Sequence, residues 1–248
     1  MQSSIILYPA ASLFCGRETF FNIHLVDRLE KMRNPDNSQK YRARLPQRDG
    51  FEFGNLTASL ASKLSPNEVD LAVKNIIYLL DLGIFLPQSD VVVANLDEPL
   101  DPGVDIELNY ARAMNKFVLG IRTDVRSPYG SSTDHVGGMH FFPAFQCDVL
   151  IRHYMPCKDI DSATREMDEL ARKVDAEIDK ADDKLFRART DQRNSEPEGT
   201  HIKKTLYYAH TLFEGVKDIH SQEGLEEIAS IYVADKTDFY SLAPRIAT

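Results

Sequence analysis

The chain has 248 residues, of which 43% are hydrophobic and 27% are charged, as in ordinary globular proteins. Its formal net charge of −9 argues against a broad surface for nucleic acid or anionic membranes, so we expect neither as a partner. No apolar run approaches the ~20 residues of a membrane span, and the first residues show no basic segment before an apolar region, so we expect no signal segment. The cysteines (Cys15, Cys147 and Cys157) follow no metal-ligand spacing, and their number is odd. We therefore expect a cytoplasmic protein without a metal or other cofactor.

A buried strand and a long helix are expected first. Residues 4–8 (SIILY) read as the strand, PAASLF as a turn, and the helix extends from about Arg17 to Met32. Its apolar side is expected to contain Phe20, Phe21, Ile23, Leu25 and Leu29. Tyr8 ends the strand, and it is either a core aromatic with a solvated hydroxyl or a hydroxyl that reaches a carboxylate at the sheet edge.

The stretch from Asn34 to Asn55 is polar and irregular, with a short strand and then a turn at Asp49-Gly50. Ser65 and Glu68 form a capping box around Pro66, which predicts a helix that continues to Asp81. Asp81 lies among apolar residues, so the helix either buries it or places it at the mouth of a cleft. Burial would raise its pKa.

The next stretch places several acids together. The apolar strand VVVANLD ends at Asp97, and Asp101 with Pro102 predicts the start of the next helix. Glu107 falls on the inward stripe of that helix, between Val104, Leu108 and Ala111. Open α/β sheets bind ligands at the carboxyl ends of their strands, where these acids are expected to gather. Alternatively, Asp101 is only a cap and Glu107 a half-exposed helix acid.

The segment after the following strand contains Arg122 and Arg126 with several hydroxyl residues (Ser127, Tyr129, Ser131 and Ser132). These side chains hold a phosphate or sugar edge, or they belong to a solvated loop. His140, beside two phenylalanines, is either a site residue or a packing histidine. From about Asp161 onward, apolar residues recur every three or four positions from Ala163 to Leu185, and residues 203–219 and 224–242 are also helical in pattern.

This order of elements predicts an α/β fold, namely a Rossmann-like doubly wound, mostly parallel sheet flanked by helices, with a helical C-terminal extension. We expect residues 1–158 to form the α/β domain. Residues 159–248 would form the extension, packed on the core or on a partner subunit.

The run SDVVVANLDEPLDPGVDIELNYARAMNKFVLGIRTD resembles the core motif of the nucleoside 2-deoxyribosyltransferase family, and ILYPAASLF is similar to that family's opening strand and loop. The resemblance covers about residues 4–145. It implies that Glu107 is the nucleophile at the anomeric carbon and that Tyr8 hydrogen-bonds Glu107. Asp101 would hold a sugar hydroxyl and orient Glu107, and Asp81 would contact or protonate the base.

The resemblance also suggests substrate-binding residues. The loop that lies over the base would supply Gln47, Arg48 and Asp49, with Phe51 or Phe53 for stacking; the alternative is a surface loop. The other expected substrate-binding residues are Phe14, Asn95, Asp97, Arg126 and Met139. Met139 matches the last residue of a family segment that reaches into a neighbouring subunit's site, although Gly137-Gly138 precede it where the family has Asn-Leu. The family forms homo-oligomers, which we expect here too.

Three functions stay open on these residues. The first is transfer of 2-deoxyribose between nucleobases through a covalent glycosyl-Glu107 intermediate, in nucleoside salvage. Such chemistry needs one ionised carboxylate and one protonated carboxyl group. The second is hydrolysis of the N-glycosidic bond of a nucleoside or nucleoside 5′-monophosphate. The third is nucleotide binding without catalysis.

Overall fold

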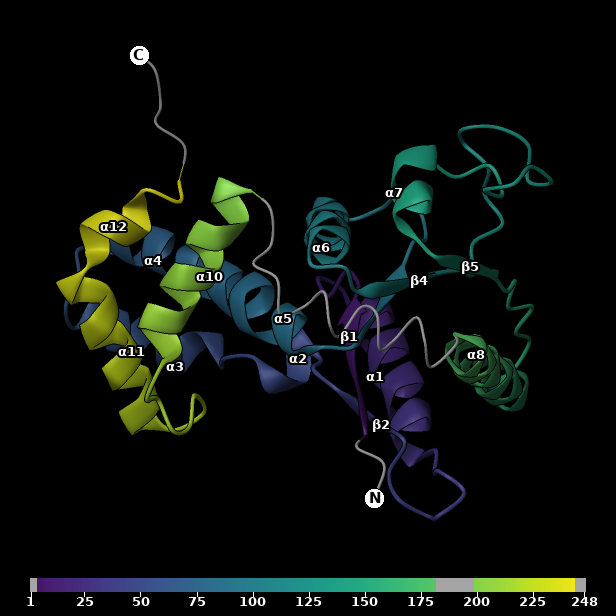
Figure 1. Ribbon diagram of the computed structural model, residues 1–248, viewed down its shortest axis with the longest axis horizontal. Helices are drawn as coiled ribbons and strands as arrows, with labels where there is room; N and C mark the ends of the chain where they lie inside the picture. Colours follow the sequence, from purple (N-terminus) through teal and green to yellow (C-terminus); the bar gives the residue numbers. More distant parts are fainter. Residues whose placement is uncertain (1–3, 182–198, 244–248) are drawn as a thin grey trace. The chain divides into compact units, whose positions relative to one another are not determined.

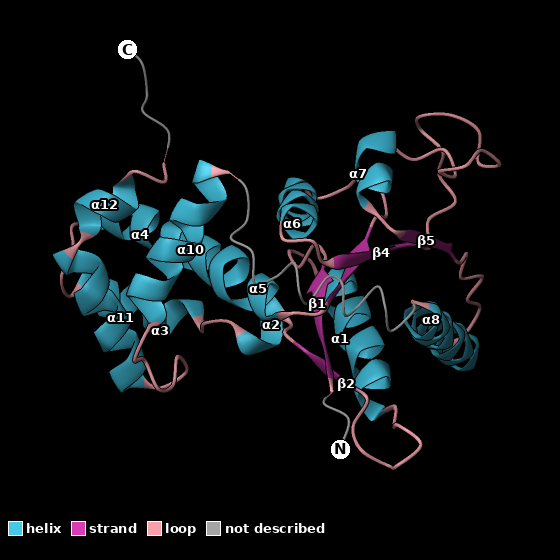
Figure 2. Cartoon of the chain, viewed as in Figure 1, coloured by secondary structure: helices cyan, strands magenta, loops and turns pink. Residues whose placement is uncertain are grey.

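A computed structural model describes residues 4–181 and 199–243 of the chain (Figures 1 and 2). The chain divides into two compact units, each built from two separate segments. Unit 1 combines Met1–Leu45 with Gln88–Pro197, and unit 2 combines Pro46–Pro87 with Glu198–Thr248. Within the described ranges, no helix is both long enough and apolar enough to span a membrane.

Unit 1 is built on a five-stranded, wholly parallel sheet in the order β2-β1-β3-β4-β5. The strands are β1 (Ile5–Ala10), β2 (Tyr41–Ala43), β3 (Val91–Asn95), β4 (Phe117–Arg122) and β5 (Val149–Arg152). The central strands β3 and β4 are apolar along almost their whole length, as expected for strands buried on both faces. The predicted Rossmann-like α/β fold is confirmed.

Helices cover both faces of this sheet. Helices α1 (Gly16–Lys31) and α8 (Ile160–Lys180) lie on one face, and α6 (Pro102–Ala113) and α7 (Phe141–Gln146) lie on the other (Figure 1). Alternate strand residues serve the two faces. Leu7, Val93 and Leu119 belong to the core cluster with α1 and α8, whereas the neighbouring Tyr8 makes its hydrogen bond to α6.

The expected apolar side of α1 is partly wrong. Phe20 and Ile23 are exposed, at 66% and 50%. The buried positions are Asn22, Leu25, Val26 and Leu29, which follow the i, i+3, i+4, i+7 spacing of a single helix face. Phe20 and Ile23 lie off that face, because the rotation of ~100° per residue turns both away from the stripe that Asn22, Leu25, Val26 and Leu29 form.

Unit 2 is helical and has its own core. Its elements are α2 (Pro46–Asp49), α3 (Phe53–Ala61), α4 (Pro66–Leu80), a π-helical turn η1 (Asp81–Phe85), α10 (Thr200–Phe213), α11 (Gln222–Ala234) and α12 (Lys236–Tyr240), with α5 (Leu86–Gln88) at its boundary with unit 1. The π-helical turn η1 and α10 approach closely at Gly83, where a Cβ atom would lie 2.2 Å from the Cβ of Ala209. The buried amide of Asn75 donates to the hydroxyl of Tyr232 at 2.9 Å, which links α4 to α11.

The predicted division at residue 158 is not where the units separate. Helix α8 belongs to unit 1, because Leu170 and Val174 are buried in the core cluster with α1 and the sheet. Segment 46–87, expected inside the α/β domain, instead groups with the helices after residue 198. Amphipathic spacing shows that a helix buries one face, but not which neighbour covers it. Leu185, the last residue of the expected stripe, lies outside the described residues.

Replacing Leu170 with alanine tests whether α8 is part of the core of unit 1. Leu170 has no exposed surface, so Leu170→Ala should lower the free energy of unfolding by ~2–5 kcal/mol. Arg165→Ala, on the exposed face of the same helix, should change it by less than ~0.5 kcal/mol. Urea denaturation followed by circular dichroism measures both, and equal effects would contradict this packing.

Candidate active site

The strand order places a crevice at the carboxyl edge of the sheet in unit 1. Strand β1 pairs with β2 on one side and with β3 on the other. The chain leaves β1 toward α1 and leaves β3 toward α6, so the connections diverge at this point. In open α/β sheets, ligands bind at such a switch point, beyond the carboxyl ends of the strands.

A tyrosine and a glutamate form a short hydrogen bond beside this edge. The hydroxyl of Tyr8 donates to Oε1 of Glu107 at 2.5 Å. Tyr8 is fully buried in β1, and Glu107 is half-buried on α6 between the buried Val104 and Leu108. A hydroxyl that donates to a carboxylate at this distance is a charge-assisted bond, which fixes the carboxylate's orientation. The predicted hydrogen bond between Tyr8 and Glu107 is present.

Asp101 begins α6 as its N-cap. Its carboxylate caps the helix by accepting the backbone N–H of Gly103 at 2.6 Å. Its predicted contact with a sugar hydroxyl and its predicted orientation of Glu107 stay predictions.

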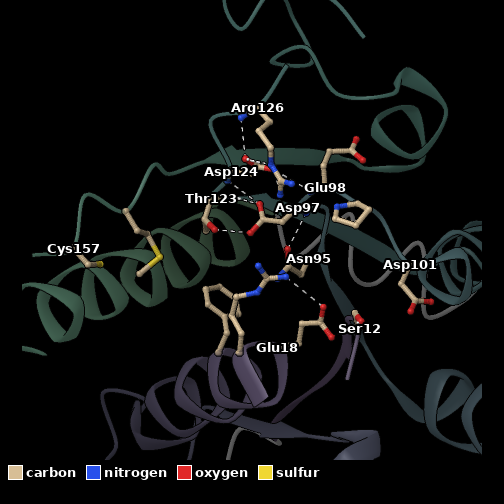
Figure 3. A pocket seen from close by; sticks show the side chains of 14 residues that line it. Ser12, Glu18, Asn95, Asp97, Glu98, Asp101, Thr123, Asp124, Arg126 and Cys157 are labelled. Atoms are coloured by element: carbon tan, nitrogen blue, oxygen red, sulfur yellow. Dashed lines mark hydrogen bonds and ion pairs between the residues drawn. The ribbon is translucent and has the colours of Figure 1, made fainter. Parts of the chain in front are cut away.

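A cavity of about 570 Å³ opens at the same edge (Figure 3). It is bordered by residues that follow β1, β3, β4 and β5 and by the start of α1. Four predicted site residues line it, namely Asn95, Asp97, Asp101 and Arg126. The other lining residues are Ser12, Arg17, Glu18, Phe21, Glu98, Pro99, Thr123, Asp124, Met155 and Cys157. Ser12 follows Tyr8 by four residues, and Asp101 precedes Glu107 by six. The cavity lining and the Tyr8–Glu107 pair are therefore close in sequence on both β1 and α6.

Asp97 organises the loops at the cavity instead of presenting an unengaged carboxylate. It accepts hydrogen bonds from the backbone N–H groups of Thr123 at 2.7 Å and Asp124 at 2.9 Å, and from the Thr123 hydroxyl at 2.6 Å. The side-chain oxygen of Asn95 in turn accepts the N–H of Asp97 at 3.0 Å. These bonds join the ends of β3 and β4, as the dashed lines in Figure 3 show.

The lining of the cavity is acidic. It contains five carboxylates, namely Glu18, Asp97, Glu98, Asp101 and Asp124, against two arginines, so its formal charge is −3. One of those arginines, Arg126, is paired with Asp124 at 2.7 Å. Although burial acts to raise the pKa of Asp124, hydrogen bonds from the backbone and side chain of Arg126 hold it below its usual value. The hydroxyl of Ser12 likewise lowers the pKa of Glu18.

Met139, predicted to bind substrate, is buried within its own chain. Its side chain is buried, with 1% exposed, after a loop in which Gly137 and Gly138 have positive φ angles. The carboxylate of Asp134 accepts the N–H of Gly138 at 2.9 Å and closes this loop onto its own chain.

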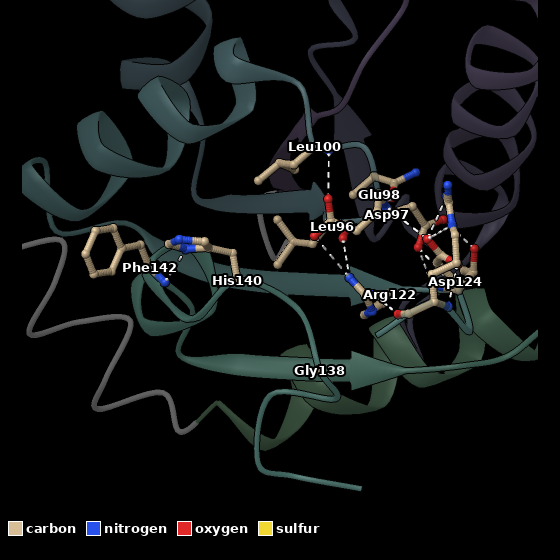
Figure 4. Close-up of polar contacts among 12 residues, drawn as sticks. Leu96, Asp97, Glu98, Leu100, Arg122, Asp124, Gly138, His140 and Phe142 are labelled. Carbon is tan, nitrogen blue, oxygen red and sulfur yellow. Dashed lines mark hydrogen bonds and ion pairs between the residues drawn. The ribbon is translucent and has the colours of Figure 1, made fainter. Parts of the chain in front are cut away.

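Arg122 and His140 both form hydrogen bonds within the protein. Arg122, proposed for a phosphate or sugar, is also buried, and it donates to the carbonyl of Leu96 at 3.1 Å (Figure 4). His140 caps α7 by accepting the N–H of Phe142 at 3.2 Å.

The remaining predicted residues lie apart from this cavity lining or belong to the other unit. Phe14 is 81% exposed, and its backbone N–H donates to Glu18 at 3.1 Å. Gln47, Asp49 and Asp81 belong to unit 2, where the carboxylate of Asp49 pairs with Arg48 at 2.9 Å. Their substrate contacts stay predictions.

The pKa of Asp81 is raised, as the sequence predicts for a buried carboxyl group. It begins the π-helical turn η1 after α4, among the buried Leu80, Leu82 and Phe85. Burial disfavours its ionised form and raises its pKa to about 7. The carboxyl group can therefore carry a proton at neutral pH.

Sequence reasoning missed several lining residues, including Ser12, Thr123, Asp124, Met155 and Cys157. Each of them follows the carboxyl end of a strand. Once β1, β4 and β5 are assigned to a parallel sheet, the residues after each of these strands are candidates by topology alone. The strand β5 had not been assigned from the sequence, so Met155 and Cys157 had no such signal.

No protein-family model matches this chain, and no curated protein sequence matches it. Along residues 4–181 and 199–243, there is no group of three or more histidine, cysteine, aspartate or glutamate side chains that could hold a metal ion.

The Tyr8–Glu107 bond should appear as an energetic coupling. Tyr8→Phe and Glu107→Gln each remove part of a charge-assisted hydrogen bond, so a double-mutant cycle should give a coupling of ~1–3 kcal/mol in the free energy of unfolding. Tyr154→Phe, at an exposed tyrosine, paired with Glu107→Gln should give a value near zero. A Tyr8–Glu107 coupling near zero would show that this bond does not form in solution.

Asp81 should make stability depend on pH. Its folded pKa of about 7 exceeds the ordinary value of 3.8, so the folded state binds more protons between these pH values. The contribution of Asp81 to stability is therefore greatest below pH ~4, falls as the pH rises toward 7, and is level above that. Asp81→Asn should remove ~2–3 kcal/mol of the loss between pH 5 and pH 8. Urea denaturation at both pH values measures this, and exposed Asp70→Asn on α4 is the control.

Proposed function

We propose that this chain is an N-glycosyltransferase that moves a 2-deoxyribosyl group between nucleobases through an ester on Glu107. The observation that carries the proposal is the Tyr8–Glu107 hydrogen bond of 2.5 Å. It supports an oriented carboxylate beside the switch point of an α/β sheet, in line with the resemblance of the core motif to nucleoside 2-deoxyribosyltransferases.

The proposed reaction has two displacements at the anomeric carbon. A Glu107 oxygen bonds to C1′ while the C1′–N bond breaks, and the base leaves with a proton from a carboxylic acid. A nitrogen of the second base then bonds to C1′, the ester bond breaks, and the proton returns to the acid.

Charge supports a nucleoside as the substrate in preference to a nucleoside 5′-monophosphate. The cavity lining, which includes neither Tyr8 nor Glu107, has a formal charge of −3; this charge would repel a phosphate group and would favour a positive charge on a sugar bound there. Arg126, the predicted phosphate contact, already donates to Asp124 at 2.7 Å. An acidic cavity whose Arg126 is already bonded to Asp124 fits an uncharged 2-deoxyribosyl group better than a phosphate.

The test supplies the protein with a 2′-deoxynucleoside and a second free base, and follows both base exchange and base release by chromatography. Exchange should exceed release, and Glu107→Ala should reduce exchange by roughly 10³-fold or more because the nucleophile is lost. Mass spectrometry of the quenched protein should find one deoxyribosyl group on the peptide that contains Glu107.

Glu169→Ala is the matched control, because Glu169 is an exposed glutamate on α8; it should exchange bases at the parent rate. Release of free base without exchange would favour an N-glycosidase. Tight nucleoside binding with no turnover in the parent protein would favour a binding module. Normal exchange by Glu107→Ala would exclude Glu107 as the nucleophile.

A further inference from the structure

A second cavity in unit 1 lies at the carboxyl ends of β4 and β5. It has a volume of about 490 Å³, and its lining includes Arg122, Arg152, His153, Ser132, Gly137 and Tyr154. We call it the basic cavity. Neither Tyr8 nor Glu107 lines it. Its volume falls in the range of ~300–1,000 Å³ that is common for small-molecule sites.

Two arginines are direct cross-strand neighbours in this cavity. The parallel register pairs Arg122 with Arg152, the last residues of β4 and β5. The bond from the N–H of His153 to the carbonyl of Arg122, at 2.8 Å, keeps the two strand ends together. Like charges at directly opposed strand positions destabilise a sheet. A bound anion would remove that repulsion.

Arg122 is a buried cation with little direct neutralisation. It is 2% exposed, and its two terminal nitrogens donate to the backbone carbonyls of Leu96 and Arg126 (Figure 4). Its ion pair with Glu98 spans 3.9 Å, too long for a hydrogen bond. Within the described part of the chain, the Nε donor of Arg122 has no acceptor. A buried charge of this kind is costly unless it is paired.

The acids nearest to this cavity are held by other donors. Asp124, which also lines it, pairs with Arg126 at 2.7 Å. The carboxylate of Asp134 accepts the N–H groups of Val136 and Gly138, each at 2.9 Å. Arg152 donates to the backbone carbonyl of Asp134 at 3.3 Å.

The ring of His153 is engaged on the α8 side of the sheet. One nitrogen lies 2.7 Å from Lys173, and the other lies 3.2 Å from a carboxylate oxygen of Glu166. These contacts leave the two arginines as the main charges that face the cavity.

We propose that the basic cavity binds a phosphate group, either as free phosphate or as a phosphate monoester of a small metabolite. A guanidinium fork matches phosphate oxygens, and the hydroxyls of Ser132 and Tyr154 are further donors at the rim. Gly137, with φ of +66°, leaves room for Arg152, because a Cβ there would lie 2.8 Å from the Cδ of Arg152. This site is separate from the proposed glycosyl transfer.

The experiment is calorimetric titration of the full chain with inorganic phosphate, a nucleoside 5′-monophosphate and the corresponding nucleoside. Phosphate and the monophosphate should each bind one site with a Kd below ~1 mM. Arg152→Gln should weaken both at least tenfold, and Arg152→Lys should weaken them less because it keeps the charge but loses the fork. Arg152 is exposed at the cavity rim, and circular dichroism checks that both variants fold.

Arg172→Gln is the matched control, because it removes an equal charge from the exposed side of α8; its phosphate affinity should equal that of the parent. Tighter binding of the monophosphate than of phosphate identifies an ester as the ligand, and equal affinities identify the free anion. The proposal is overturned if neither phosphate nor the monophosphate binds below ~10 mM, or if Arg152→Gln binds like the parent. These measurements require no turnover, so their outcome does not depend on whether the proposed glycosyl transfer is correct.

Discussion

The reversal of strand order at β1 is the constraint on which unit 1 depends. Because β1 pairs in parallel with both β2 and β3, the segments that leave β1 and β3 must pass to opposite faces of the sheet. This divergence opens the crevice at the carboxyl edge. The same arrangement puts Tyr8 on the face covered by α6, so that its hydroxyl meets Glu107. The acidic cavity is bordered by the loops that follow the same strands. The position of the site is thus a consequence of topology, and the residues that fill it determine its chemistry.

Many carboxylates coexist at this edge because each is held by nearby donors, most of them uncharged. Glu107 receives the hydroxyl of Tyr8, Asp97 receives two backbone N–H groups and a threonine hydroxyl, and Asp101 receives the N–H of Gly103. Dipoles of this kind stabilise an ionised carboxylate without cancelling its charge. The edge therefore remains electronegative and already ordered before any ligand arrives, which is the property that the proposed sugar chemistry requires. The basic cavity shows the opposite arrangement. Two arginines, Arg122 and Arg152, are neighbours on β4 and β5, and the nearest carboxylates accept hydrogen bonds from other donors.

Features governed by local rules could be predicted from the sequence, and features governed by long-range packing could not. The capping box at Ser65, the Asp101-Pro102 helix start and the apolar strand of β3 depend on neighbours within a few residues, and all three are present. The inward turn of Glu107 follows from helical spacing. By contrast, the partners of Asp97 depend on the register between β3 and β4, which no local pattern encodes. The same limit explains the buried Met139 and the misplaced division at residue 158. The sequence left Arg122 either at a phosphate or sugar edge or in a solvated loop, and its burial at the end of β4 follows from the sheet and not from any local pattern.

Unit 2 is built from two segments that are far apart in the sequence and are therefore synthesised at different times. Helices α3 and α4 emerge early, but α10, α11 and α12, which bury their apolar faces, come more than a hundred residues later. The residues of unit 1 that lie between them can form their sheet first. Until α10, α11 and α12 have been synthesised, the nascent chain therefore exposes Leu60 and Ile76, which are fully buried in the folded protein. The core of unit 2 forms only once α10, α11 and α12 are present. A chain interrupted before α10 would combine an ordered sheet with exposed apolar surface on α3 and α4, which favours aggregation.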